Sequence, residues 1–162
     1  MSDICLSSFL YYQGLYKPSL LILRSGVENY FKCIGIAYDQ NVLVIGSVYE
    51  LINVVKSTPQ VVADNIVRLQ VQKLHNIYAI LCEHVHTSDA NKMSLTSVVG
   101  KFPRFKSTIA KFASSQINSA CLAVIAINCV ILPGLMTRFH HTHRDAVLDS
   151  LPAKVKRHLA SL

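Results

Sequence analysis

The chain has 162 residues, of which 51% are hydrophobic and 15% charged, and its formal net charge is +7. This apolar composition excludes a chain that stays fully solvated, because much of it has to be buried in its own core, in a partner or in a membrane. The length suits one domain with a substantial core, so we expect a single domain over residues 1–162, and the positive charge is compatible with an anionic partner.

Two helices are predicted at the start of the chain. The first covers about residues 3–13 and ends at Gly14. The second begins at Lys17 and Pro18, since proline is well placed in a first helical turn, and runs to about residue 38. At the helical period its apolar face consists of Leu20, Leu23, Val27, Tyr30, Phe31, Ile34 and Tyr38.

Arg24 falls inside the edge of this apolar face, and Glu28 follows one turn later. A charge at such a position is costly unless it is paired or reaches a wet cavity. One interpretation is a structural ion pair between the two residues within the helix. The other is a functional site to which a second segment of the chain contributes.

The next part of the chain predicts a turn at residues 39–41 and a helix over about residues 46–56. The β-branched run of residues 42–45 has strand character, but without an evident pairing partner we interpret it as the lead into that helix. Residues 57–59 separate it from a long helix over about residues 60–86. The apolar face of the long helix consists of Ile66, Val67, Val71, Leu74, Ile77, Tyr78, Leu81 and Val85.

Titratable side chains follow one edge of this long helix, at Arg68, His75 and His86. His86 lies at the predicted end of the helix, where the helix dipole favours a histidine cation. Simple packing at a helix end therefore accounts for it. The functional alternative is an acid, a base or a phosphate-directed donor beside Arg24.

The carboxyl-terminal half predicts further helices. A polar loop over residues 87–92 precedes a short helix at 95–100, and a long helix over 105–132 follows. Its last part, residues 120–132, is shorter than the roughly 20 residues of a membrane span, so we expect a buried bundle helix and no membrane partner. With short helices at 145–150 and 152–159, the expected fold is an all-α, compact multi-helix bundle of six to eight helices.

Two basic clusters are candidate contact sites for phosphate groups, such as those of a nucleic acid. Lys101, Arg104 and Lys106 alternate with phenylalanines, which suits a nucleic-acid backbone with base stacking. The plain alternative is a loop leading into a helix, with its phenylalanines turned inward. In the second cluster Arg138, three histidines and Arg144 favour a basic, phosphate-contacting or partner-facing turn over a metal site, because no second ligand cluster is evident.

The cysteines and the first residues indicate a location in the cytoplasm. The chain has five cysteines, an odd number without a Cys-x-x-Cys pair, and most fall within apolar segments. This pattern is typical of thiols in a reducing cytosol rather than of a disulfide framework. The first ten residues contain Asp3 and no basic stretch, so we expect no secretory signal.

Two segments together resemble bacterial HEPN-like proteins. The run LLILRSGVENYFK (residues 20–32) looks like the Leu-Arg-x-x-x-Glu helix of that family. The run NIYAILCEHVHTS (residues 76–88) resembles its later helix, which ends in a hydrophobic residue, His, and Gly, Ser or Thr. The order of the two segments matches, and the resemblance covers roughly residues 10–90.

This resemblance implies an all-α protein that often dimerises and that cleaves RNA, without metal or another cofactor, in a toxin or antiphage-defence system. The matching positions are Arg24, Glu28 and His86. Arginine would polarise the scissile phosphate, histidine would assist proton transfer, and Glu28 would orient one of them. The alternative is a non-catalytic helical interaction module, or an antitoxin-like partner, whose apolar surface covers an interface.

The family's nuclease hallmark is an arginine followed after four to six residues by histidine. No arginine precedes His86 at that spacing. Two other pairs fit it, Arg68 with His75 and Arg138 with His143, and the second is closer to the family's usual place near the start of a late helix. The candidate catalytic set is therefore Arg24, Glu28 and His86 together with Arg138 and His143.

Overall fold

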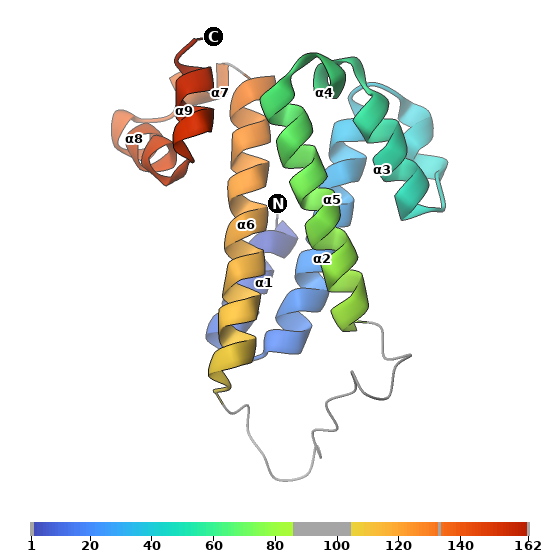
Figure 1. Cartoon of the computed structure of the whole chain (residues 1–162), viewed down its shortest axis with the longest axis vertical. Helices are drawn as coiled ribbons and strands as arrows, with labels where there is room; N and C mark the ends of the chain where they lie inside the picture. Colours follow the sequence, from blue (N-terminus) through green and yellow to red (C-terminus); the bar gives the residue numbers. More distant parts are fainter. Residues whose placement is uncertain (1, 86–104, 133, 162) are drawn as a thin grey trace. The chain divides into compact units, whose positions relative to one another are not determined.

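The computed structural model describes residues 2–85, 105–132 and 134–161, and the described chain is entirely helical apart from its connections (Figure 1). An all-α multi-helix bundle is thereby confirmed. The helices are α1 (Ser2–Tyr12), α2 (Tyr16–Ile36), the 3₁₀ helix η1 (Gln40–Val44), α3 (Val48–Ser57), α4 (Pro59–Ala63), α5 (Asn65–Val85), α6 (Ser107–Ile131), α7 (Gly134–Arg138), α8 (His141–Ser150) and α9 (Ala153–Leu159).

The described residues form two compact units, each built from an early and a late segment of the chain. The first unit comprises Met1–Tyr30 and Asn76–Ser119, and the second comprises Phe31–His75 and Ala120–Leu162. Helices α2, α5 and α6 contribute residues to both units. Since neither unit is a continuous piece of chain, no single cut would separate them.

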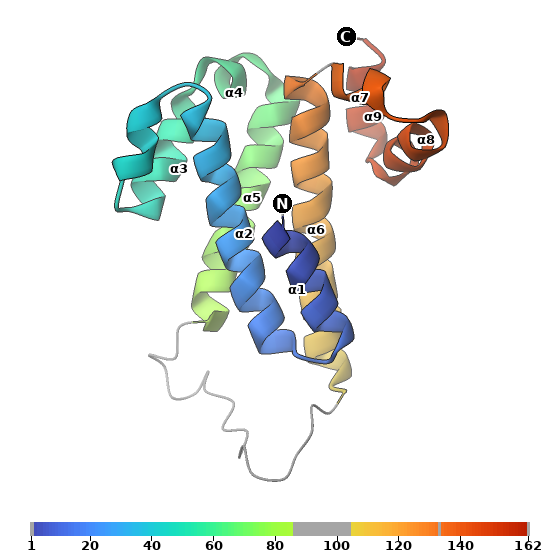
Figure 2. The same ribbon diagram turned by 180° about the vertical axis from the view of Figure 1, so that it is seen from behind.

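In the first unit, α1 runs antiparallel to the beginning of α2, as Figure 2 shows. Two fully buried serines join these helices. The Ser7 hydroxyl donates to the Ser19 carbonyl at 2.9 Å, and the Ser19 hydroxyl donates to the Ser7 carbonyl at 2.8 Å. At the other end, the Asp3 carboxylate accepts from Asn29 Nδ2 at 2.9 Å. Because both buried hydroxyls are satisfied, burying them carries little penalty.

Gly14, in the tight connection between α1 and α2, has a φ of 74°. This left-handed conformation is easy for glycine and strained for other residues. We expect Gly14→Ala to lower the free energy of unfolding by about 1 kcal/mol, measured by urea denaturation. The matched control is Gly46→Ala, where an added Cβ meets nothing within 4 Å, so stability should stay constant or rise slightly. Equal losses in both variants would contradict this account of Gly14.

In the second unit, residues 40–44 form the 3₁₀ helix η1 rather than the start of α3. Asp39 caps η1, since its carboxylate accepts from the Asn41 amide at 2.8 Å. Val42 is 1% exposed and packs on Gly35, where an added Cβ would lie 2.7 Å from Val42 Cγ1. The lack of a side chain at Gly35 thus lets the β-branched segment fold back against α2 without a strand.

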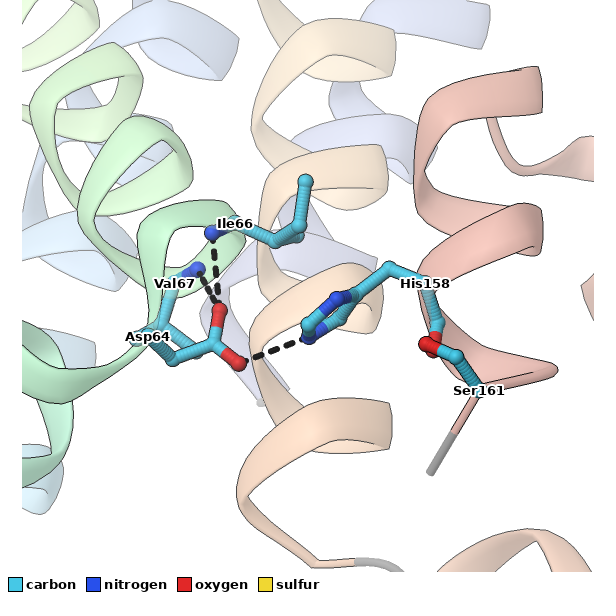
Figure 3. A network of polar contacts seen from close by, with 5 residues as sticks. All are labelled: Asp64, Ile66, Val67, His158 and Ser161. Carbon is cyan, nitrogen blue, oxygen red and sulfur yellow. Dashed lines mark hydrogen bonds and ion pairs between the residues drawn. The ribbon is translucent and has the colours of Figure 1, made fainter.

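Asp64 divides the long helix expected over residues 60–86, so the prediction of one continuous helix was wrong there. Its backbone is extended, with φ −108° and ψ 119°, and ends α4. Its carboxylate Oδ1 accepts from the amides of Ile66 at 2.7 Å and Val67 at 2.9 Å, which caps α5 (Figure 3). An aspartate at this position satisfies helix donors that would otherwise be orphaned.

The carboxyl-terminal helices also differ from the prediction. Helix α7 was not expected, and α8 begins at His141 rather than near residue 145. Neither helix has a buried residue, so neither has an apolar period that a sequence pattern can reveal. The helix predicted at residues 95–100 lies outside the described residues.

A core cluster of the second unit joins α5, α6 and the last segment of the chain. Its buried members are Ile66, Ala126, Cys129, Leu151 and Val155. Among the described helices, α6 alone is long and apolar enough to cross a membrane, with 39% of the most apolar window buried in the structure. Core helices of proteins outside membranes pass the same test, so length and composition decide little here.

Candidate functional site

Arg24 is held against α5 by two side chains one helical turn apart. Its Nε donates to Cys82 Sγ at 3.2 Å, and its Nη2 donates to Tyr78 Oη at 3.2 Å. The guanidinium carbon lies 5.4 Å from the centre of the Tyr78 ring. All three residues belong to the first unit. The charge on the apolar face of α2 therefore has specific hydrogen-bond partners, and these lie on α5.

These contacts also set the protonation of the site. The hydrogen bond with Cys82 raises the pKa of Arg24, with a smaller contribution from Tyr78 against the opposing effect of burial. Burial, together with a hydrogen bond to Cys82, raises the pKa of Tyr78 to about 12, although Arg24 acts in the opposite direction. At neutral pH the site is therefore a fixed guanidinium cation beside a neutral phenol.

An arginine fixed in this way suits an anion. Guanidinium carries five N–H donors in a rigid fork, and among the described residues its contacts with Tyr78 and Cys82 use Nε and Nη2 rather than Nη1. Neither of these partners is a carboxylate that would neutralise the charge. Arg24 is only partly buried, so the fork is within reach of a ligand from solvent. Phosphate and carboxylate oxygens are the acceptors that match such a fork.

Of the other two expected site residues, the structure describes Glu28 but not His86. Glu28 lies one turn after Arg24 on α2, is half-buried and makes an interaction of its own. His86 lies outside the described residues, four positions after Cys82 in the sequence. His84, just before it, stacks on Phe112 of α6 with ring centres 4.3 Å apart, which is a packing role.

The amino end of α6 carries an exposed aromatic and basic surface in the same unit. Phe105 is 77% exposed, so it is not turned inward as the plain alternative required. Lys106 and Lys111 are exposed beside it, and a shallow hollow of about 340 Å³ is lined by Tyr11, Phe105, Ser107, Ala110, Lys111, Ser114 and Ser115. Lys101 and Arg104 of the same predicted cluster lie outside the described residues. An exposed ring next to cations is suited to stacking with a base.

The second predicted pair, Arg138 and His143, belongs to the second unit. Arg138 is the last residue of α7, and His143 lies in the first turn of α8. Both side chains are exposed. Arg144 is also exposed and lies 3.7 Å from the carboxylate of its neighbour Asp145. This part of the chain is a basic, histidine-rich surface.

No ligand set for a metal ion was predicted, and the described residues contain no group of three or more His, Cys, Asp and Glu side chains arranged to hold one. The histidines of residues 140–143 pack on each other instead. The rings of His140 and His141 have centres 4.0 Å apart, and those of His140 and His143 are 6.2 Å apart.

A further pair, Lys56 and His75, lies within the second unit and was not expected from the sequence. Lys56 Nζ is 2.7 Å from His75 Nδ1, and Tyr49 contacts the imidazole edge-on with ring centres 6.2 Å apart. Burial and the charge of Lys56 lower the pKa of His75, and burial lowers the pKa of Lys56. A neutral imidazole accepting from the ammonium group accounts for these contacts. Arg68, which the Arg–His spacing paired with His75, instead donates to Asn65 Oδ1 at 2.9 Å.

The lowered pKa of His75 predicts a pH dependence of stability. The unfolded chain takes up a proton at this histidine near pH 6.5, whereas the folded chain does so only at lower pH. Stability should therefore be complete above pH 6.5 and fall below it, by at most about 1.4 kcal/mol per pH unit for one proton. Urea unfolding at pH 7.5 and 5.5 measures this loss.

We expect His75→Gln to reduce that acid loss, because the variant cannot take up the proton. The control is His141→Gln on the exposed start of α8, which leaves the Lys56–His75 contact intact. If His75→Gln and the parent lose the same stability between the two pH values, the proposed protonation state of His75 is wrong.

Comparisons with known proteins give no further guide to this site, since no protein-family model, curated protein or solved structure matches the chain significantly.

Proposed function

We propose that the protein is a HEPN-like, metal-independent endoribonuclease of a bacterial toxin or antiphage-defence system that acts in the cytoplasm as a homodimer or with a cognate partner protein. The observation that supports this proposal is the anchoring of Arg24 on α5 by Tyr78 and Cys82. It brings together the two helices that carry the family resemblance, at a point four residues before His86 in the sequence.

In this mechanism Arg24 binds the scissile phosphate. Its guanidinium stabilises the charge that grows on the phosphate oxygens as the ribose 2′-hydroxyl attacks phosphorus and the bond to the 5′-oxygen of the next nucleotide breaks. His86 assists the transfer of the 2′-hydroxyl proton, and Glu28 orients one of the two residues. Tyr78 and Cys82 act as positioning residues, because they fix the guanidinium fork without neutralising its charge.

The exposed surface at the start of α6 would bind the rest of the RNA strand. Phe105 offers a ring for base stacking, and Lys106 and Lys111 offer cations for the backbone phosphates. Lys101, Arg104 and Arg144 are further proposed phosphate contacts. Stacking tolerates any base, so this surface predicts single-stranded RNA with little sequence preference.

The RNA surface is tested by titrating a fluorescent single-stranded RNA whose 2′-hydroxyls are methylated, so that the proposed chemistry cannot cleave it. We expect Phe105→Ala to weaken binding about 5- to 100-fold, the loss of one stacked base. Lys106→Glu with Lys111→Glu should weaken it further and flatten its salt dependence. The control is Lys17→Glu with Lys154→Glu, an equal charge change at two exposed lysines outside this surface, which should change binding less. Parent-like binding by the first two variants would contradict the proposed surface.

A non-catalytic interaction module remains the second candidate, and one observation favours it. Helix α1 exposes large apolar side chains, with Leu6 at 46%, Phe9 at 59% and Tyr12 at 81%. Such a face is typical of a protein interface. Purification of the chain as an obligate complex, with no RNA cleavage after it is freed from its partner, would favour this function over the nuclease.

A further inference from the structure

The second unit contains a cavity of about 530 Å³ whose lining comes from α6, α7, α8 and the end of α9. This volume is within the range of roughly 300–1,000 Å³ typical of small-molecule sites. The lining consists of five apolar residues and two cations: Cys129, Met136, Leu148, Leu159 and Ala160, with Arg144 and Lys156. Of the lining residues, only Arg144 is also one of the proposed RNA contacts.

The apolar part of the cavity is adaptable and uncharged. Cys129 is 2% exposed, and its Sγ donates to Met136 Sδ at 3.4 Å. Burial raises the pKa of the Cys129 thiol, so it behaves as a small apolar group. Met136 and Leu159 also pack on the core cluster of this unit, and methionine adapts its shape to irregular ligands. This part of the lining is suited to a hydrocarbon chain.

The two cations mark the wetter part of the cavity. The side chains of Arg144 and Lys156 are 47% and 38% exposed. Arg144 Nε lies 3.7 Å from Asp145, and Lys156 Nζ lies 3.6 Å from the Asp149 carboxylate and donates to the Asp149 carbonyl at 3.1 Å. These carboxylates are 62% and 88% exposed and do not line the cavity, so such surface pairs compete weakly with a bound anion.

The charge of the surrounding segment reinforces this polarity. Residues 138–162 contain five Lys and Arg residues against two Asp residues. A neutral apolar ligand would leave that positive charge unused. The two cations favour an anionic head group. A ligand with two long chains exceeds a cavity of this volume, so one apolar compartment beside two cations favours an anion with a single chain.

We propose that this cavity binds a free medium-chain fatty acid of about ten carbons. Its acyl chain would lie against Cys129, Met136 and Leu159, and its carboxylate would bind Arg144 and Lys156. An arginine fork can hold a carboxylate with two parallel hydrogen bonds, and the lysine adds a second charge. The inference does not rest on the proposed cleavage site at Arg24, and it shares only Arg144 with the proposed RNA contacts.

Titration calorimetry with decanoate tests the ligand class. We expect decanoate to bind at least about tenfold more tightly than decanol, which lacks the charge. Hexanoate should bind on the order of 10²-fold more weakly than decanoate, because each buried methylene contributes about fourfold. Equal binding of decanol and decanoate, or affinity independent of chain length, would overturn the proposal.

Charge reversal at the cavity tests the site itself. Lys156→Glu should weaken decanoate binding at least about tenfold and strengthen binding of decyltrimethylammonium. The control is Lys154→Glu, the same change two residues earlier on α9 and outside the lining, which should bind decanoate like the parent. Leu148→Trp, which fills the cavity, should block both ligands and keeps the test valid if the charge variant fails to fold. Equal effects of Lys156→Glu and Lys154→Glu would overturn the site.

Sedimentation distinguishes the fatty acid from two other occupants of the cavity, a second copy of the chain and a lipid surface. If the parent protein forms a dimer that Lys156→Glu or Leu148→Trp dissociates and decanoate does not, the cavity receives a second copy of the chain and the fatty-acid proposal fails. It also fails if the parent cosediments with phosphatidylglycerol vesicles, Lys156→Glu does not, and free decanoate shows no binding.

Discussion

Arg24→Ala should lower the rate of RNA cleavage by at least about 10²-fold, the usual effect of removing a group that stabilises charge in the transition state. The measurement is cleavage of a labelled single-stranded RNA by the purified protein in EDTA, together with growth of cells that express it. The substitution removes one hydrogen-bond donor from Tyr78 Oη, so we expect a stability loss of only about 1–3 kcal/mol. Circular dichroism should show unchanged helical content.

Three further substitutions separate a catalytic role of Arg24 from a structural one. Arg24→Lys keeps the charge but loses the fork, so it should regain only part of the activity. Tyr78→Phe removes one of the two anchors and leaves the charge, so it should lower kcat by less than Arg24→Ala. Lys17→Ala, at an exposed position on α2, is the matched control and should stay active. A folded Arg24→Ala protein with full activity would show that Arg24 is only structural.

His86 is tested in the same assay. We expect His86→Ala to abolish cleavage, because the 2′-hydroxyl proton then loses the histidine that assists its transfer. Substitution of His143 distinguishes the second spacing pair. If His143→Ala is inactive and His86→Ala is active, the site belongs to Arg138 and His143 of the second unit rather than to Arg24.

Most of the fold was accessible from the sequence because its long helices have strong apolar periods. Leu20, Leu23, Val27, Phe31 and Ile34 were all assigned to one face of α2, and all are buried. Helix α8 buries no residue, and its histidine-rich start has no such period. Its beginning at His141 was therefore missed, because α8 has no row of apolar residues that faces a core.

The sequence predicted that Arg24 needs a partner, but it did not identify the residues that contact Arg24. A charge on an apolar face indicated that Arg24 required a receiver. The receiver is the polar end of Tyr78, a residue that had been assigned to the apolar face of the long helix, and the sulfur of Cys82. Both side chains are apolar by composition, so charge patterns could not single them out. The one usable signal was their spacing of one helical turn.

Asp64 carries the largest stability effect that we expect from a single polar side chain. Its carboxylate caps α5 through Oδ1, while Oδ2 lies 2.7 Å from His158 Nε2 of α9 (Figure 3). The two side chains are only 19% and 28% exposed. We expect Asp64→Ala to lower the free energy of unfolding by about 2 kcal/mol, the upper end for loss of a helix cap, because His158 loses its partner as well. Urea denaturation at pH 7 measures this.

Two matched variants divide this effect into its parts. Asp64→Asn retains an oxygen that can cap α5 but removes the negative charge, so it should cost about half as much as Asp64→Ala. His158→Ala removes only the tether to α9. In a double-mutant cycle, Asp64→Ala and His158→Ala should cost less together than the sum of the single losses, by about 0.5–1.5 kcal/mol. Strict additivity would mean that the 2.7 Å contact contributes nothing to stability.

The pH dependence of the Asp64 contribution has a definite sign. Hydrogen bonds from the Val67 amide and from His158 lower the pKa of Asp64, although burial acts in the opposite direction. The unfolded chain therefore takes up a proton at this carboxyl near pH 3.9, before the folded chain does. The stabilisation is present above that pH and is lost as pH falls through the lower folded pKa. The difference in unfolding free energy between the parent and Asp64→Ala should thus shrink as pH falls below 4. A difference that grows as pH falls below 4 would refute this assignment, since it would require a carboxyl that is easier to protonate in the folded protein.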